Sequence, residues 1–167
     1  MILKSRNTGS TKEYSAENLT FLRKYINKST GLTSGRDMKK HILIIDDDKA
    51  MCQLLEKMLV KNYLITSKYD GVEAMQWMMD GVIPDLIITD VEMPSLDGVE
   101  FLKNLKNSSY YSDVPIIVIS GYDSKEQKLK CLKYGAYEYF VKPFNPRDLL
   151  FTIEIVLKLN QEKLNIL

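Results

Sequence analysis

The sequence predicts an α/β fold in which helices cover both faces of a parallel, doubly wound sheet. From residue 41 onward, short aliphatic runs alternate five times with segments of helical periodicity. The first run is apolar at four consecutive positions, as expected for a parallel strand that is buried on both faces. Strands that alternate with helices imply right-handed crossovers, which place helices on both sides of one sheet.

Each predicted strand is a run of aliphatic, β-branched or aromatic residues between polar segments. Residues 41–45 are continuously aliphatic after their histidine, which is typical of a central strand. The remaining strands are expected at about residues 63–67, 86–89, 116–119 and 139–141.

A helix is expected after every strand. Five apolar residues after the first strand repeat at i, i+3, i+4, i+7 and i+8, the pattern of a helix with one buried side; they are Met51, Leu54, Leu55, Met58 and Leu59. The expected N-caps are Asp48, Asp70 (with Glu73), Asp97 (with Glu100), Ser124 (with Gln127) and Asn145 (before Pro146).

Charge divides the chain near Met38. Residues 1–40 carry nine Lys and Arg against three acids, a net +6, whereas the remainder carries 14 against 19, a net −5. We therefore expect a basic, flexible arm at residues 1–37, a folded domain at 38–160 and a tail at 161–167. The arm could form a short helix over about 17–28, but it could equally be plain solvated chain.

The composition indicates a cytoplasmic protein. No apolar run approaches the roughly 18 residues that a membrane span needs, and the N-terminus lacks the apolar core of a secretory signal. Cys52 and Cys131 lie far apart in no metal-ligand spacing, so we expect two reduced, buried thiols.

Polar side chains directly follow four of the predicted strands. Asp46 and Asp47 follow the first, Asp90 the third, Ser120 the fourth and Lys142 the fifth. The carboxyl ends of parallel strands meet at one edge, so these groups should converge there. Three clustered carboxylates need a cation, and Mg²⁺ suits oxygen ligands with room for phosphate. Asp90 could then act as a nucleophile and form an acyl phosphate, with Lys142 and Ser120 binding the phosphate oxygens.

Together these motifs resemble the receiver domains of two-component signalling. The resemblance covers about residues 38–159, and the motifs that carry it are residues 44–48, 84–94, 96–98, 118–121 and 141–144. It implies a flavodoxin-like, five-stranded sheet of strand order 2-1-3-4-5 with five helices. It also implies a protein that is not a classical enzyme, with only Mg²⁺-dependent self-phosphorylation and self-dephosphorylation.

The resemblance also implies a role for each site residue. The roles are phosphoacceptor for Asp90, direct metal ligand for Asp47, metal ligand through water for Asp46, metal ligand through its backbone carbonyl for Glu92, switch hydroxyl for Ser120, aromatic switch for Tyr139 and phosphate-binding lysine for Lys142. The bond from Lys142 to Pro143 is expected to be cis.

The implied partners are a histidine kinase or phosphotransfer protein and an unknown downstream protein. Phosphate on Asp90 should draw Ser120 toward it and turn Tyr139 inward, which would alter the surface of the fourth helix, fifth strand and last helix. Phe151, Ile155 and Leu159 form a second apolar side of the last helix, which is either buried or a surface for a homodimer or partner. No output domain follows that helix, so a stand-alone receiver is expected.

Several residues also have purely structural interpretations. Ser120 could simply end a strand, Tyr139 could be ordinary strand packing, and His41 is expected to be structural. Glu92 and Tyr122 each lie two residues beyond a site residue and should flank the phosphate. There they should hinder the water that hydrolyses an acyl phosphate, so slow self-dephosphorylation is expected.

Two other functions remain as alternatives. The basic segment 18–33 faintly resembles part of an AraC-type DNA-binding region, but the preceding helix is missing, so a nucleic-acid partner is not expected. A haloacid-dehalogenase-like hydrolase would place an aspartate two residues after its nucleophile, where this chain has Glu92, and the substrate cap is missing.

Overall fold

The computed structural model describes residues 2–3, 12–13, 39–93 and 98–164. It separates into two compact units, residues 1–38 and 39–167. In the first unit, β1 (Ile2–Leu3) pairs antiparallel with β2 (Lys12–Glu13). The helix expected over about 17–28, the basic segment 18–33, the Asp97 cap and residues 165–167 lie outside the described residues. The tail expected from residue 161 is wrong in part, because residues 161–164 continue the last helix.

The second unit is built on a five-stranded parallel sheet of order β4-β3-β5-β6-β7. The strands are β3 (His41–Ile45), β4 (Leu64–Lys68), β5 (Leu86–Thr89), β6 (Ile116–Ser120) and β7 (Glu138–Val141). When these five strands are numbered 1 to 5 in chain order, their order in the sheet is 2-1-3-4-5. This order confirms the flavodoxin-like fold predicted from the sequence.

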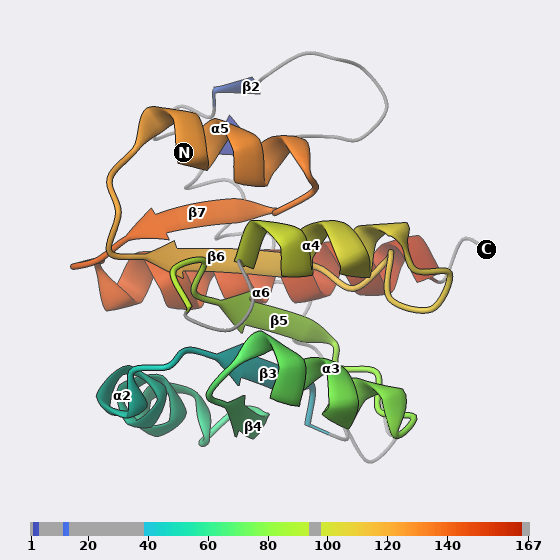
Figure 1. The fold of residues 1–167 in the computed structure, drawn as a ribbon. Coiled ribbons are helices and arrows are strands. Elements are labelled where there is room, and N and C mark those ends of the chain that lie inside the picture. The colour runs from blue at the N-terminus through green and yellow to red at the C-terminus, as the bar shows by residue number, and fades with distance from the viewer. Residues whose placement is uncertain (1, 4–11, 14–38, 94–97, 165–167) are drawn as a thin grey trace. The chain divides into compact units, whose positions relative to one another are not determined.

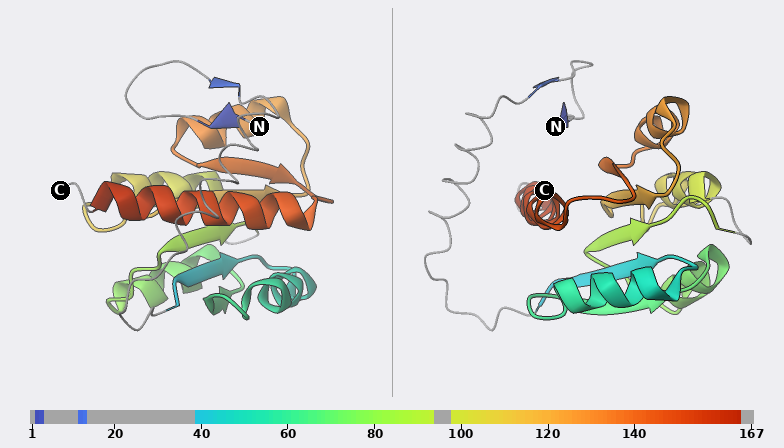
Figure 2. Two further views of the ribbon diagram at one scale, coloured as in Figure 1. Left: turned by 180° about the vertical axis from the view of Figure 1, so that it is seen from behind. Right: turned by 90° about the vertical axis from the view of Figure 1, so that its left-hand side faces the viewer.

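Helices cover both faces of this sheet (Figures 1 and 2). They are α2 (Lys49–Leu59), α3 (Gly71–Met79), α4 (Gly98–Asn107), α5 (Lys125–Lys133) and α6 (Pro146–Leu164). Helices α3, α4 and α5 pack on one face through one apolar cluster, and α2 and α6 pack on the other through a second. The aliphatic side chains of β5 and β6 and of residues 42–45 in β3 are fully buried between them, and each such side chain stabilises the fold by about 1.5–3 kcal/mol.

The helices begin at the expected N-caps wherever the chain is described. In each case a side-chain oxygen accepts a hydrogen bond from a backbone N–H of the first turn. The pairs are Asp48 with Ala50 at 2.8 Å, Asp70 with Glu73 at 2.7 Å, Ser124 with Gln127 at 3.3 Å and Asn145 with Arg147 at 3.0 Å.

The expected apolar face of α2 is wrong at one position, and the two alternatives for the second apolar side of α6 each hold for part of it. The spacing predicts Leu54 on the buried side of α2, but Leu54 is 49% exposed, and Cys52 is buried in its place. The buried stripe of α2 therefore runs through Cys52, Leu55 and Leu59. On α6, Ile155 is only 3% exposed, so it is no free surface, while Leu159 is about half exposed.

Candidate functional site

Four strands end beside one another at one edge of the sheet and deliver the polar residues there. Backbone bonds continue the pairing one residue past the strands: Asp90 N–H donates to the Ile45 carbonyl at 2.8 Å, and Lys142 N–H donates to the Ser120 carbonyl at 2.8 Å. Asp46 is held in the same way, by a 3.2 Å bond to the Lys68 carbonyl. The backbone of each site residue is thus fixed by its neighbouring strand.

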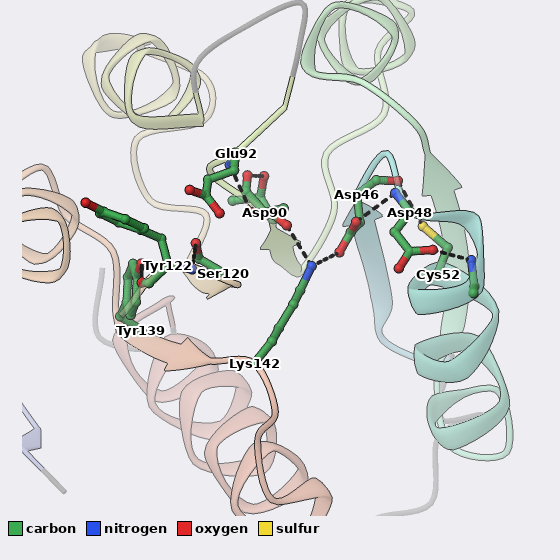
Figure 3. A network of polar contacts seen from close by, with 11 residues as sticks. Asp46, Asp48, Cys52, Asp90, Glu92, Ser120, Tyr122, Tyr139 and Lys142 are labelled. Atoms are coloured by element: carbon green, nitrogen blue, oxygen red, sulfur yellow. Dashed lines mark hydrogen bonds and ion pairs between the residues drawn. The ribbon is translucent and has the colours of Figure 1, made fainter. Parts of the chain in front are cut away.

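Lys142 lies between two of the three acids (Figure 3). Its Nζ is 2.8 Å from Asp46 Oδ2 and 2.6 Å from Asp90 Oδ2. The two carboxyl groups are almost wholly buried, so the ammonium group replaces much of their lost hydration. Burial lowers the pKa of Lys142, but hydrogen bonds to Asp46 and Asp90 outweigh burial and raise its pKa overall, so Lys142 stays charged.

Asp46 is fixed by contacts on both of its carboxylate oxygens. Its Oδ2 accepts from Lys142, and its Oδ1 accepts from Asp48 N–H at 2.9 Å. Burial raises the pKa of Asp46, although Lys142 and the Asp48 N–H oppose the rise. Cys52 donates from Sγ to the Asp46 carbonyl at 3.3 Å, and burial followed by the charge of Asp46 raises the pKa of this thiol to about 11. Cys52 is therefore a structural thiol rather than a nucleophile.

The acids form a set that fits a divalent cation. Asp46, Asp47 and Asp90 each offer a carboxylate oxygen, and these oxygens lie within 4.8 Å of one another. Three carboxylates beside one ammonium group leave two negative charges, which one divalent ion balances. Hard oxygen donors on one side, with Asp47 exposed to solvent, suit Mg²⁺, which keeps several of its waters.

The Asp90 carboxylate is oriented from two sides. Its Oδ2 accepts from Lys142, and its Oδ1 accepts from Glu92 N–H at 2.9 Å. The Glu92 side chain is exposed, and its Oε2 lies 3.6 Å from the position that a Cβ on Gly121 would occupy. Glu92 therefore flanks the acceptor on the side of the β6–α5 loop (Figure 3).

Ser120 and Tyr139 are joined through the backbone of Tyr122. Ser120 Oγ accepts from Tyr122 N–H at 3.1 Å, and the Tyr139 hydroxyl donates to the Tyr122 carbonyl at 2.7 Å. The Tyr139 ring is 3% exposed, and burial raises the pKa of its hydroxyl. The sequence could not reveal this link, because a backbone carbonyl that accepts a side-chain bond has no residue signature.

The structure brings Asp46, Asp47, Asp90 and Lys142 together and places Ser120 on the adjoining strand end (Figure 3). The Lys142–Pro143 bond is cis, as expected. Asp48 caps α2 and donates its N–H to Asp46, so it supports the site rather than entering it.

In the part of the chain that the structure describes, none of the helices is both long enough and apolar enough to span a membrane.

Comparison with known proteins gives a consistent result. A family model described as the response regulator receiver domain matches residues 42–154. The response regulator MprA of Mycobacterium ulcerans is 36% identical over 122 residues, which are 72% of this chain and 51% of that protein. This chain therefore spans about half the length of the curated relative that it matches.

Solved structures show the same likeness. A CheY-like receiver domain from Methanospirillum hungatei superposes with a TM-score of 0.69 at 28% identity, covering 75% of this chain and 99% of that one. The chemotaxis response regulator CheY4 of Vibrio cholerae gives a TM-score of 0.65 at 33% identity, covering 71% and 99%.

Proposed function

Because this chain belongs to the response regulator receiver family of two-component signalling, we propose that it accepts a phosphoryl group on Asp90. The donor would be a histidine kinase or a phosphotransfer protein. The observation that carries this proposal is the setting of Asp90: a buried carboxylate held between Lys142 and the Glu92 N–H, beside two further acids. Neither the family nor the site is that of a classical enzyme.

In the transfer step, a carboxylate oxygen of Asp90 attacks the phosphorus of a phosphohistidine. The new O–P bond forms as the N–P bond breaks, and the leaving imidazole nitrogen keeps the electron pair and takes up a proton. Lys142 already lies 2.6 Å from Asp90, so its ammonium group is within reach of the phosphoryl oxygens without a large movement. Asp46, Asp47, Asp90 and the Glu92 carbonyl would hold Mg²⁺, which would neutralise charge on the transferring group.

Ser120 and Tyr139 would report the change. The Ser120 hydroxyl would turn from the Tyr122 N–H to a phosphoryl oxygen, which shifts the loop that leads into α5. Since the Tyr139 ring is already buried, phosphorylation would stabilise this position rather than create it. The surface of α5, β7 and α6 would change with the phosphorylation state and regulate a partner protein.

The proposal is tested by incubating the full chain with Mg²⁺ and acetyl phosphate. The mass should rise by one phosphoryl group in the wild type and in Asp80→Ala, an exposed acid at the end of α3, but not in Asp90→Ala. An unchanged wild-type mass, or a phosphorylated Asp90→Ala, would contradict it.

Glu92 and Tyr122 should slow the loss of the phosphoryl group. The Glu92 side chain lies over Gly121 beside the acceptor, and the Tyr122 ring is 53% exposed at the neighbouring loop, so both limit in-line access of water. Time courses by mass spectrometry after removal of acetyl phosphate should show faster loss in Glu92→Ala and Tyr122→Ala than in the wild type. A wild-type lifetime of only seconds would refute this mechanism.

A further inference from the structure

Helix α3 and the segments around it are acidic and rich in methionine. Residues 69–102 carry eight acids and no lysine or arginine, although the chain as a whole carries 23 basic residues against 22 acids. The same stretch holds four of the eight methionines of the chain. Methionine side chains are flexible and polarisable, and they are common on surfaces that adapt to partner helices. This composition indicates a surface for a basic partner, provided that apolar side chains of the stretch are exposed.

One apolar side of α3 is exposed to solvent. Val72 and Met79 lie at i and i+7, so they share one side of the helix, and their exposed fractions are 45% and 74%. Met75 lies between them on the same side and is partly buried against the core. Exposed apolar residues that occur singly are ordinary, but a group of them marks a site of interaction.

The loop between α4 and β6 adds an exposed tyrosine at the end of α3. The Tyr111 hydroxyl donates to the Met78 carbonyl at 2.8 Å, so this loop is fixed to the last turn of the helix. The centroid of the neighbouring Tyr110 ring lies 6.4 Å from that of Tyr111, and Tyr110 is 78% exposed. Among the described residues, Tyr110 and Met79 are the two most exposed large apolar side chains. Two separate segments therefore bring them to the same end of α3.

The same end of α3 is negative and has no cation of its own. The carbonyl groups of the last turn form the negative end of the helix dipole, and this turn contains no basic residue. Asp80 caps the helix and adds an exposed carboxylate, which forms no ion pair within the described residues. By contrast, Asp85, the next acid in the chain, is paired with Lys40 at 3.0 Å. A cationic group of a partner would therefore be stabilised at Asp80.

This end of α3 lies at the opposite edge of the sheet from Asp90. Met79 precedes the amino end of β5 and Tyr110 precedes the amino end of β6, whereas Asp90 and Ser120 lie at the carboxyl ends of those strands. In Figure 1 the arrows of the sheet point away from this edge. The surface is therefore separate from the phosphorylation site and from the surface of α5, β7 and α6, so binding here should not depend on phosphorylation.

The charge at the end of α3 decides between the possible occupants. Nucleic acids and anionic lipid headgroups are negative and would be repelled by Asp80. A second copy of this chain would bring two equal negative ends together across a two-fold axis. A helix with an apolar side and flanking lysines would bury Met79 and Tyr110 and pair with Asp80. The basic amphipathic helix is thus the occupant that fits in both charge and apolar surface.

From these observations we infer that a basic amphipathic helix of a partner protein binds at the end of α3, whether or not the receiver is phosphorylated. The surface, the α3 face, consists of Val72, Met75, Met79, Asp80 and Tyr110. Its apolar side chains would hold apolar residues of the partner helix, and Asp80 with the helix dipole would select lysine or arginine beside them. This inference does not rest on the phosphorylation proposed above, and it gives the domain a second surface for recruitment.

The test is fluorescence anisotropy of the full chain with labelled helical peptides, in buffer with Mg²⁺. The basic probe carries Leu at i, i+3, i+4 and i+7 with Lys on both flanks, and a second probe replaces each Leu by Ser. The basic probe should bind at least about tenfold more tightly than the Ser probe. Its affinity should fall with rising salt, because exposed charges are screened. Equal binding of the two probes would overturn the inference, because charge alone would then account for the binding.

Matched variants locate the binding surface. Met79→Ser and Tyr110→Ser remove exposed side chains, and each should weaken binding of the basic probe about tenfold. Asp80→Lys should weaken it at least about tenfold, although a lysine at the end of α3 interacts favourably with the helix dipole, so the loss would not come from unfolding. Leu129→Ser and Glu126→Lys, at an exposed leucine and an exposed acid of α5, should bind as the wild type does. Wild-type binding by the α3 variants, or equal losses in the α5 variants, would overturn the inference.

Two outcomes would assign the α3 face to a different occupant. If Arg23→Glu combined with Lys24→Glu raised the affinity for the basic probe about tenfold, the basic arm of the chain itself would be the occupant. If the wild type formed a dimer in sedimentation velocity and Met79→Ser abolished that dimer, a second copy would be the occupant. Either result would overturn the inference of a separate partner protein, and we expect neither.

Mass spectrometry of the same samples, with and without acetyl phosphate, separates this inference from the proposed function. When the mass rises by one phosphoryl group, the affinity for the basic probe should change by less than about twofold, and a larger change would overturn its independence from phosphorylation. If the mass does not rise and the probe binds the α3 face, the proposed function fails and the inference stands. If the mass rises and the probe does not bind, the proposed function stands and the inference fails.

Discussion

Helices α6 and α5 pack on opposite faces of the sheet and differ greatly in how firmly they are attached (Figure 2). Helix α6, with 19 residues, buries four apolar side chains in the cluster it shares with the sheet and α2, whereas α5, with nine residues, fully buries only Cys131. Helix α6 begins four residues after Lys142, and α5 follows the loop that begins after Ser120. The helix that follows the lysine is therefore firmly packed, and the helix that follows the Ser120 loop can move at a smaller cost in free energy.

The largest expected effect tests this difference in packing. Ile153→Ala on α6 removes a fully buried side chain and should lower the free energy of unfolding by about 2–5 kcal/mol. Cys131→Ala, the matching change on α5, should cost about 1 kcal/mol. Urea denaturation of both variants measures the difference. Equal losses would show that the two helices are attached equally firmly.

The sequence predicted the parts of the fold that depend on local pattern. The strands of residues 41–45 and 86–89 have the predicted bounds, because continuous aliphatic runs between polar residues leave little choice. Strand β4 begins one residue later than expected, since an edge strand with exposed residues has a weaker pattern. Leu54 was misplaced because the spacing allows two adjacent stripes, and only the packing of α2 against β3 decides between them.

A smaller effect on stability is expected from the Tyr139 hydroxyl, which joins β7 to the loop that leads into α5. Tyr139→Phe removes the 2.7 Å bond to the Tyr122 carbonyl and should cost about 0.5–1.5 kcal/mol. Amides of residues 121–124 and of α5 should exchange faster with solvent, while those of α6 should not change. Tyr110→Phe, at a side chain that is 78% exposed, is the control. Unchanged exchange in the loop would show that this bond does not hold it.

The candidate site was predictable as a set of residues but not as a set of contacts. Because parallel strands end at one edge of a sheet, the sequence predicts that Asp46, Asp47, Asp90 and Lys142 lie together. Which acids Lys142 contacts depends on side-chain rotamers at the scale of an ångström, so its bonds to Asp46 and Asp90 needed the structure. The link from Tyr139 to the Tyr122 carbonyl needed it for the same reason.

The smallest expected effect lies at the amino end of β3, in the firmly packed part of the sheet. His41, the only histidine, lies 2.9 Å from Thr66 Oγ1 through Nε2 and meets the Trp77 ring edge-on at 5.3 Å between centroids. Burial lowers its pKa below 6.5, although the charge of Asp85 opposes the shift. The folded chain then binds fewer protons than the unfolded chain, so this part of the stability is present above pH 6.5 and is lost as the pH falls through the folded pKa.

An NMR titration of the imidazole should therefore give a pKa below 6.5, and His41→Gln should remove this pH dependence from the unfolding free energy. The pH dependence of amide hydrogen exchange tests whether α5 and α6 respond to this change in the sheet. Protonation of His41 should speed amide exchange in β3, which contains His41, and in β4, which contains Thr66. The ratio of the exchange rates in α5 and α6 should not change, because neither helix contacts the His41 ring. A His41 pKa at or above 6.5 would contradict the burial argument. A changed ratio of α5 to α6 exchange would mean that strands β3 and β4 are coupled to α5.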